Sequence, residues 1–212
     1  RYVGKYAEQD ALITLKLWDN LSKKITQQEC SSIFELEIDL LPVLFEMKTK
    51  GVRVDVEKAH QTKKDLTKIE KSLVQEIVKE TGVTIEPWVA TSVAKVFDAV
   101  GLPYSRTEKA GAPMFTKQFL TNCSHPIAQK IVKIREINKA NTTFVDTILE
   151  HSHNGRIHCD FHSLRSDGGG TVTGRFSSSN PNLQQIPARD PEIKKLIRGL
   201  FIPEEGHKWG SF

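Results

Sequence analysis

A long, highly charged helix between Asp55 and Gly82 is the feature that most limits how this chain can fold. Asp55 stands where a helix N-cap belongs, and Gly82 stands where a glycine usually ends a helix. Between them the apolar residues keep to one narrow face, which comprises Leu66, Ile69, Leu73 and Ile77. A helix of about seven turns with so narrow an apolar face packs along one seam and is solvated elsewhere. The sequence therefore predicts an antiparallel helical arm.

Further helices are predicted on both sides of this arm, from apolar residues at helical spacing and from capping residues. They lie within residues 1–24, from about Ile33 to Gly51, from Thr91 or Ser92 to Gly101, from Ser124 or Pro126 past Ile148, and from Asp190 onward. Strands are predicted where apolar and polar residues alternate, at 156–161, 200–202 and 208–212. His158 and His162 lack a third ligand nearby and are interpreted as surface residues. The predicted fold class is α+β, mostly helical.

Size and composition exclude several classes of protein. With 212 residues, 38% of them hydrophobic and 26% charged, the chain can bury a core, and disorder is not expected. The longest unbroken apolar stretch, 40–45, is far shorter than the ~20 residues that span a bilayer, so a soluble intracellular protein is expected. Cys30, Cys123 and Cys159 lie too far apart for a zinc motif and are interpreted as reduced packing residues.

Basic residues gather in two segments. Residues 104–143 hold seven Lys or Arg against two Glu, and residues 165–198 hold six against three acidic residues, within a total charge of +4. Such clusters suit a polyphosphate partner, and a solvated helix face explains them as well. On the helix after Pro126, a polar stripe opposite the isoleucines could face solvent or a phosphate backbone. This stripe comprises Arg135, Lys139, Thr142 and Thr143.

An aperiodic run from Thr173 to Pro187 is the most specific segment of the chain. It reads TGRFSSSNPNLQQIP and concentrates hydrogen-bond donors in a loop fixed by one glycine and two prolines. The run resembles the T-G-R-[LF]-S-S-x-x-P-N-L-Q-N-I-P signature of family-A DNA polymerases, with Gln185 where that family usually has Asn. Such a long match favours this family over a generic polar loop.

Weaker matches to the same family follow in the order that it requires. Residues 34–55 resemble its segment joining exonuclease to thumb, residues 135–144 resemble a thumb helix, and residues 155–158 resemble a strand entering the palm. The chain departs from the family's usual residues at 142–144 and at 86–88, where it reads Glu-Pro-Trp.

Near the N-terminus, Tyr6 and Asp10 resemble the Y-x-x-x-D motif of proofreading 3′–5′ exonucleases. The resemblance implies that Asp10 is a metal ligand and that Tyr6 orients the attacking water in a two-metal hydrolysis. A Tyr and an Asp four residues apart are also typical of a surface helix. Their position directly before the thumb-like segment favours the exonuclease interpretation.

The resemblance implies three parts: residues 1–24 as the C-terminal end of a 3′–5′ exonuclease domain, 25–150 as a polymerase thumb, and 151–212 as the start of the palm. The implied function is template-directed nucleotidyl transfer to a primer 3′ end in DNA replication, with proofreading. Mg²⁺, primer–template DNA and dNTPs are the implied cofactor and partners. The first catalytic aspartate is expected to follow Phe212, so the chain by itself is expected to be inactive.

The resemblance also implies roles for individual side chains. Arg175, Asn182 and Gln184 are expected to donate hydrogen bonds to minor-groove acceptors, which occupy nearly the same place in every base pair. Ser177 is expected to contact DNA from the same loop. The expected contacts that hold the DNA backbone without sequence preference are Arg135, Lys139, Thr142, Thr143 and Arg189.

Two other functions stay open at this point. One is a non-catalytic module that keeps the thumb and the loop for duplex contact, and the other is an exonuclease alone, which leaves the loop without a purpose. No thioredoxin-type insertion is seen in the thumb. The motif variants favour a phage over a cellular origin, and the expected location is the bacterial cytosol or nucleoid, or the host cytoplasm for a phage protein.

Overall fold

The computed structural model describes residues 2–164, 170–187 and 190–210. It is mostly helical with a few short strands, which confirms the predicted α+β class. The chain forms two compact units. Unit 1 comprises Arg1–Lys50 and Phe161–Ser177, and unit 2 comprises Gly51–Asp160 and Ser178–Phe212. No helix among the described residues is long and apolar enough to cross a membrane.

Unit 1 is built on two helices, α1 (Tyr2–Gln27) and α2 (Ser31–Lys50). Both were predicted, and α2 begins slightly before the expected residue. Trp18 of α1 and Phe34 of α2 bring their ring centroids to 5.6 Å, so an aromatic contact joins the two helices. Cys30, which lies between them, is exposed, and the prediction that it packs inside the protein is therefore wrong.

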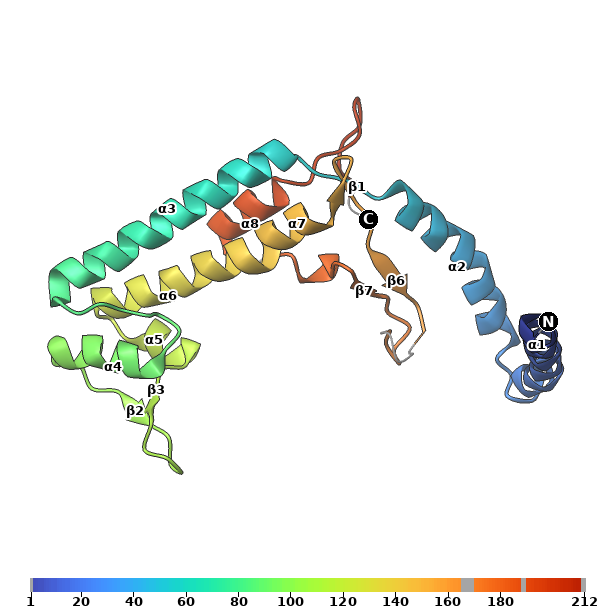
Figure 1. Cartoon of the computed structure of the whole chain (residues 1–212), viewed down its shortest axis with the longest axis horizontal. Helices are drawn as coiled ribbons and strands as arrows, with labels where there is room; N and C mark the ends of the chain where they lie inside the picture. The colour runs from blue at the N-terminus through green and yellow to red at the C-terminus, as the bar shows by residue number, and fades with distance from the viewer. Residues whose placement is uncertain (1, 165–169, 188–189, 211–212) are drawn as a thin grey trace. The chain divides into compact units, whose positions relative to one another are not determined.

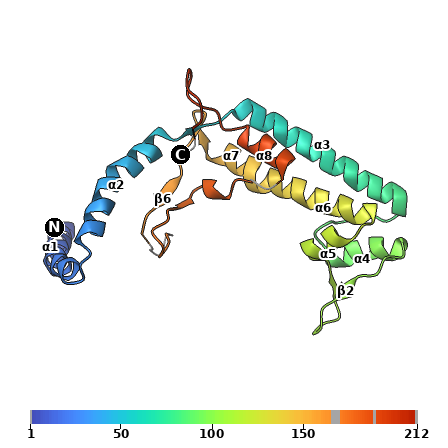
Figure 2. The same cartoon turned by 180° about the vertical axis from the view of Figure 1, so that it is seen from behind.

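Unit 2 contains the predicted antiparallel arm, in which α3 (Val56–Thr81) lies beside α6 (Pro126–Lys139) and α7 (Asp146–His151) (Figures 1 and 2). The Asp55 side chain caps α3 by accepting a hydrogen bond from the Lys58 amide at 2.9 Å, and Gly82 ends the helix in the left-handed conformation. Ion pairs join Lys63 to Asp146 at the base of the arm and Lys130 to Glu76 further along it. These crossed positions confirm that the helices run antiparallel.

The second long helix of the arm is not α-helical throughout. A π-helical segment, η1 (Ala140–Val145), joins α6 to α7, and the Asp146 amide donates to the Asn141 carbonyl five residues earlier. The Thr142 hydroxyl donates to the Asn138 carbonyl at 2.9 Å. α6 begins at Pro126, within the predicted start. Its N-cap is His125, whose Nδ1 accepts from the Ile127 amide at 3.3 Å.

A small subdomain, called the tip, lies at the end of the arm remote from α8 (Figure 1). Its elements are α4 (Ala90–Ala99), β2 (Ser105–Arg106), β3 (Pro113–Met114) and α5 (Lys117–Asn122). Phe97 and Phe115 pack with centroids 4.8 Å apart in its core. The expected cap of α4 is wrong, because the helix begins at Ala90 and the Ser92 hydroxyl instead accepts from the Glu86 amide.

The base of unit 2 holds a three-stranded antiparallel sheet in the order β1 (Val52–Arg53), β5 (Arg156–Ile157), β4 (Ser152–His153). Its hairpin turns at Asn154 and Gly155, which both have positive φ, as a two-residue Asn-Gly turn requires. The base has its own buried cluster, which includes Val54, Leu66, Ile137, Ile148 and Ile157. Leu73 of α3 packs against both this cluster and the core of the tip.

The predicted strand 156–161 is interrupted, because β5 ends at Ile157 and the next strand, β6, spans Asp160–His162. β5 pairs with β1 on one side and with β4 on the other. At the level of His158, β1 has ended and Gly51 stands there at φ +64, while on the other side the chain belongs to α7. The ladder of this sheet therefore ends at Ile157. His158 and His162 are half-buried, which corrects the expectation of surface residues.

The last part of the chain contains β7 (Ser177–Ser179), a 3₁₀-helix η2 (Leu183–Gln185) and α8 (Pro191–Arg198). The Asp190 cap of α8 is confirmed, since its Oδ1 accepts from the Ile193 amide at 2.9 Å. The two strands predicted after α8 are wrong for the described residues. Phe201 forms one isolated bridge with Val54, and residues 208–210 form no strand, while 211–212 lie outside the described residues.

Candidate nucleic-acid interface

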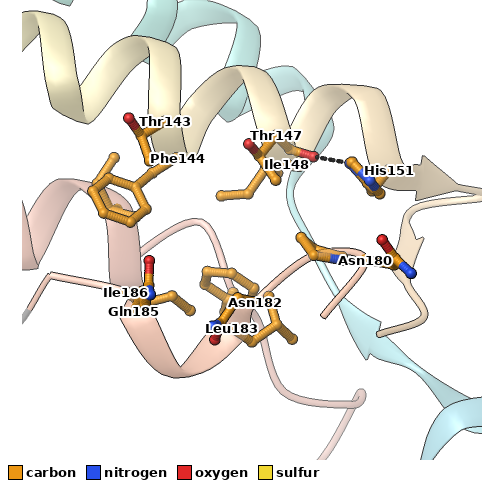
Figure 3. Close-up of a pocket in the computed structure, with 13 residues that line it drawn as sticks. Thr143, Phe144, Thr147, Ile148, His151, Asn180, Asn182, Leu183, Gln185 and Ile186 are labelled. Atoms are coloured by element: carbon orange, nitrogen blue, oxygen red, sulfur yellow. Dashed lines mark hydrogen bonds between the residues drawn. The ribbon is translucent and has the colours of Figure 1, made fainter. Parts of the chain in front are cut away.

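Three adjoining pockets in unit 2 surround η1 and the last turn of α6. The loop pocket, of about 310 Å³, lies between η1–α7 and the segment 180–186 (Figure 3). The tip pocket, of about 420 Å³, lies between α6–η1 and the tip, and the central pocket, of about 530 Å³, lies between α5, α6 and residues 184–187. Thr143 lines the first two pockets, and Lys117 and Lys139 line the last two. The three pockets therefore form one hollowed surface.

Internal hydrogen bonds hold the second half of the signature loop in shape. The buried Ser178 hydroxyl donates to Asn182 Oδ1 at 3.2 Å and accepts from the Leu183 amide at 3.1 Å. Asn182 Oδ1 also accepts from the Gln184 amide at 3.0 Å and so caps η2. Asn180 lies at positive φ before a cis peptide bond to Pro181, and its Nδ2 donates to Asp160 Oδ2. Much of the polarity of this run therefore shapes the loop itself.

The same bonds leave specific donors at the surface. With its Oδ1 bound inside the loop, Asn182 keeps its Nδ2 group for an external acceptor, and the residue is exposed. Gln184 and Gln185 are exposed beside the central pocket. These amide groups are chemically suited to acceptors of the minor groove, as the sequence led us to expect.

Arg135 lies on the wall of the tip pocket and is tied to the protein. Its Nε donates to the Pro87 carbonyl at 2.8 Å and another guanidinium nitrogen donates to the Phe115 carbonyl at 3.0 Å. Burial lowers the pKa of this guanidinium from its ordinary value. Because both bonds go to tip carbonyls, Arg135 attaches the tip to α6, and its expected phosphate contact stays a prediction.

The other residues predicted to contact the DNA backbone differ in whether their polar groups are already hydrogen-bonded within the protein. Lys139 is exposed, and its ammonium group has no partner among the described residues. Thr143 is exposed between two of the pockets. Thr142 is exposed as well, but its hydroxyl proton is already bound to the Asn138 carbonyl, so in this state the hydroxyl can only accept.

Carboxylates moderate the positive charge of this surface. Lys117 pairs with Glu136 at 2.8 Å, and Lys133 pairs with Glu192 of α8 at 2.6 Å. The hydrogen bond that Lys133 donates to Glu192 raises the pKa of Lys133 above its ordinary value. Lys139 is thus the cation of the stripe that is most available to a phosphate, which needs a positive group to replace its counterions.

Comparison with known proteins assigns the chain to a family. Residues 56–211 match the family described as DNA polymerase family A. The chain belongs to DNA polymerase family A. A DNA-directed DNA polymerase of Pseudomonas phage M6 is 34% identical over 100% of this chain. A thermostable DNA polymerase I of Thermus filiformis is 34% identical over 97% of it. This chain covers 33% of the first relative and 25% of the second.

A solved polymerase structure supports the assignment. It is described as the POL domain of Pol1 from M. smegmatis in complex with DNA primer-template and dNTP. It matches with a TM-score of 0.66 and 27% identity over 81% of this chain and 30% of that one. The family-A resemblance that the signature loop indicated is confirmed.

The remaining predicted site residues of this family-A chain lie in unit 1 or outside the described residues. Arg175 is exposed, and its carbonyl accepts from the Thr171 hydroxyl, while the Ser177 hydroxyl accepts from the Gly170 amide at 2.8 Å. Tyr6 and Asp10 are exposed one turn apart on α1. Arg189 lies outside the described residues.

Sequence reasoning missed several residues of the family-A surface. Thr147 and His151 line the loop pocket (Figure 3) and continue the spacing of four that begins at Thr143, so extending the helical wheel past η1 would have found them. Trp88 and Lys117 line the tip pocket. Trp88 lies just before α4 and Lys117 begins α5, and only the fold brings them to the stripe of α6.

Proposed function

We propose that the protein containing this chain is a template-directed DNA polymerase and that this chain holds the primer–template duplex. Its membership of family A supports the proposal, as does its likeness to a polymerase domain complexed with DNA primer-template and dNTP. The observation that carries it is the hollowed surface around η1, where an available lysine, hydroxyls and loop amides face outward. Within this proposal, residues 25–150 are the thumb, 151–212 begin the palm and 1–24 end an exonuclease domain.

The surface offers two kinds of contact. Lys139, with Lys117 nearby, can neutralise phosphates of either strand and position the duplex without sequence preference. Asn182 and the exposed glutamines can reach acceptors that every base pair presents in the minor groove. Together they hold a duplex of any sequence, which template-directed synthesis requires.

The described residues do not themselves fit a Mg²⁺ site. Among residues 2–164, 170–187 and 190–210, no group of three or more His, Cys, Asp or Glu side chains could hold a metal ion. Asp10 is exposed on α1, and its role as an exonuclease metal ligand stays a prediction. The contribution proposed for this chain is the binding of DNA.

Duplex binding and primer extension test the proposal together. Titration of labelled primer–template duplexes with this chain should give weak binding that falls steeply with salt and hardly changes with sequence. The full-length protein should extend the primer when the four dNTPs are supplied. Binding without extension by the full-length protein would favour a non-catalytic duplex-binding module, and tight binding to one sequence only would contradict the proposed contacts.

A further inference from the structure

We propose that Trp88 is an apolar contact for the sugar–phosphate backbone of duplex DNA, a role that rests on the proposed function. Trp88 is 53% exposed and lines the tip pocket. Single exposed apolar residues are common on proteins, so exposure alone says little. The way Trp88 is held and the residues that surround it make the case.

The backbone that carries Trp88 is fixed in place. Pro87 is buried, and its carbonyl accepts from Arg135 Nε at 2.8 Å. The guanidinium carbon of Arg135 lies 6.0 Å from the centroid of the Trp88 ring, within reach of a cation–π attraction. A second bond from Arg135 to the Phe115 carbonyl fixes the guanidinium itself. The backbone beside Trp88 and the contact with Arg135 thus restrain the indole, which lowers the entropy lost on binding.

The neighbours of Trp88 in the tip pocket are those of a backbone-binding surface. Leu120 and Val132 supply an apolar part of the lining. Its cations are Lys139, Arg135 and Lys117, the last of which pairs with Glu136. A nucleic-acid strand presents the same alternation, because apolar deoxyribose faces lie between anionic phosphates. The bases of a duplex are covered by their neighbours in the stack. The indole would therefore meet a sugar when the lysines meet phosphates.

If Trp88 has this role, the binding free energy has a salt-dependent part from phosphate contacts and a salt-independent part from the indole, and the two can be measured separately. A phosphate contact releases counterions and contributes to the dependence of affinity on salt, whereas an apolar contact does not. Trp88→Ala should lower duplex affinity about tenfold at every salt concentration and leave the salt slope unchanged. Lys139→Ala should instead reduce the slope by about one unit.

Trp209→Ala is the matched control. Trp209 is 61% exposed, belongs to the same unit and lies outside the three pockets, so its removal should leave affinity unchanged. Trp88→Phe keeps an apolar ring and should retain most of the affinity, which separates loss of contact from misfolding. Equal affinity of Trp88→Ala and the unsubstituted chain at all salts would overturn the proposal.

Fluorescence reports the contact directly. The chain has three tryptophans, so the Trp18→Phe/Trp209→Phe variant keeps Trp88 as its one indole. Its emission should change on titration with duplex, at the same midpoint as binding. A change seen only with single-stranded DNA would overturn the proposal in favour of stacking on unpaired bases. If the unsubstituted chain bound no duplex at all, the proposed function itself would fail, whereas binding that ignores Trp88 would refute this inference alone.

Discussion

At the scale of single residues, Asn141 shows how the π-helical segment is held. Its side chain is buried, its Nδ2 donates to the Thr67 hydroxyl of α3 at 3.1 Å, and its Oδ1 has no partner among the described residues. On either side of this bond, Asn138 donates to Glu70 at 3.0 Å and Lys63 pairs with Asp146 at 2.7 Å. These polar contacts fix the place where the helix widens, and so they direct the hydroxyls that follow.

Removal of the Thr67 hydroxyl should show how much its buried hydrogen bond with Asn141 contributes to the free energy of unfolding. Thr67→Val leaves both polar groups of the Asn141 side chain unpaired in the interior and should lower the free energy of unfolding by about 1–3 kcal/mol. Asn141→Leu removes the polar groups altogether, and in the double variant part of the loss should be recovered. Urea unfolding of the four proteins gives the coupling free energy. Thr91→Val, on the exposed surface of α4, is the control and should change stability by less than about 0.5 kcal/mol. Strictly additive losses would refute the account.

At the scale of elements, Lys130 links α6 to α3. Its ammonium group contacts both Glu80 and Glu76, and the hydrogen bond with Glu80, followed by that with Glu76, raises its pKa above the ordinary 10.5. A pKa that is higher in the folded chain than in the unfolded chain stabilises the fold below 10.5. That contribution is lost as pH rises through the folded value.

Lys130→Met should therefore be less stable than the unsubstituted chain, and this difference should decrease only at high pH. The difference in unfolding free energy from the unsubstituted chain should be constant between pH 7 and about 10 and should shrink at higher pH, where the ammonium group loses its proton. Lys95→Met, on an exposed position of α4, corrects for the general effect of alkaline conditions. A defect that stayed the same above pH 11 would show that Lys130 contributes through its aliphatic stem instead.

The elements also show what the sequence could and could not predict. The caps at Asp55, Gly82 and Asp190 were read correctly because each depends on one side chain or one glycine and its nearest neighbours. The end of β5 at Ile157 was not predictable, since it depends on where the distant strand β1 and the neighbouring strand β4 stop pairing with it. The π-helical segment likewise depends on contacts with α3, 74 residues away for the Thr67–Asn141 bond.

The candidate site follows the same division. Lys139, Thr143 and Asn182 were found because a helical face or a sequence signature carries them, and the structure places all three at the hollowed surface. Trp88 was not chosen, because its neighbours in space come from α5 and α6. Arg135 was assigned to phosphate from its place on the helical wheel, which could not reveal the two carbonyls that it binds.

At the scale of the whole molecule, the described chain forms two compact units, the second of which begins at Gly51. The three-part division stays a proposal. The chain spans about a third of the length of its phage relative, so activity belongs to the longer protein in this proposal.

We expect the 212-residue chain to bind duplex without adding or removing nucleotides. The chain covers 33% of the phage polymerase that it matches, and we propose that nucleotide transfer needs the rest of the longer protein. Primer extension and 3′-degradation assays with Mg²⁺ or Mn²⁺ check this, with the full-length protein as the positive control. Turnover that co-purifies with the chain and persists through repeated preparation would contradict the expectation.

Gly51, where unit 2 begins, is a position that should tolerate no other residue. Its φ of +64 already disfavours any other residue, and a Cβ there would lie 2.7 Å from His158 Nδ1 and 2.8 Å from the Ile157 carbonyl oxygen. Every single-nucleotide change that replaces this glycine would add that Cβ. A smaller residue at 158 could relieve the first clash but not the second, because the carbonyl belongs to the backbone. A second substitution would therefore not remove both clashes, and we expect substitutions of Gly51 to be rare among tolerated mutations.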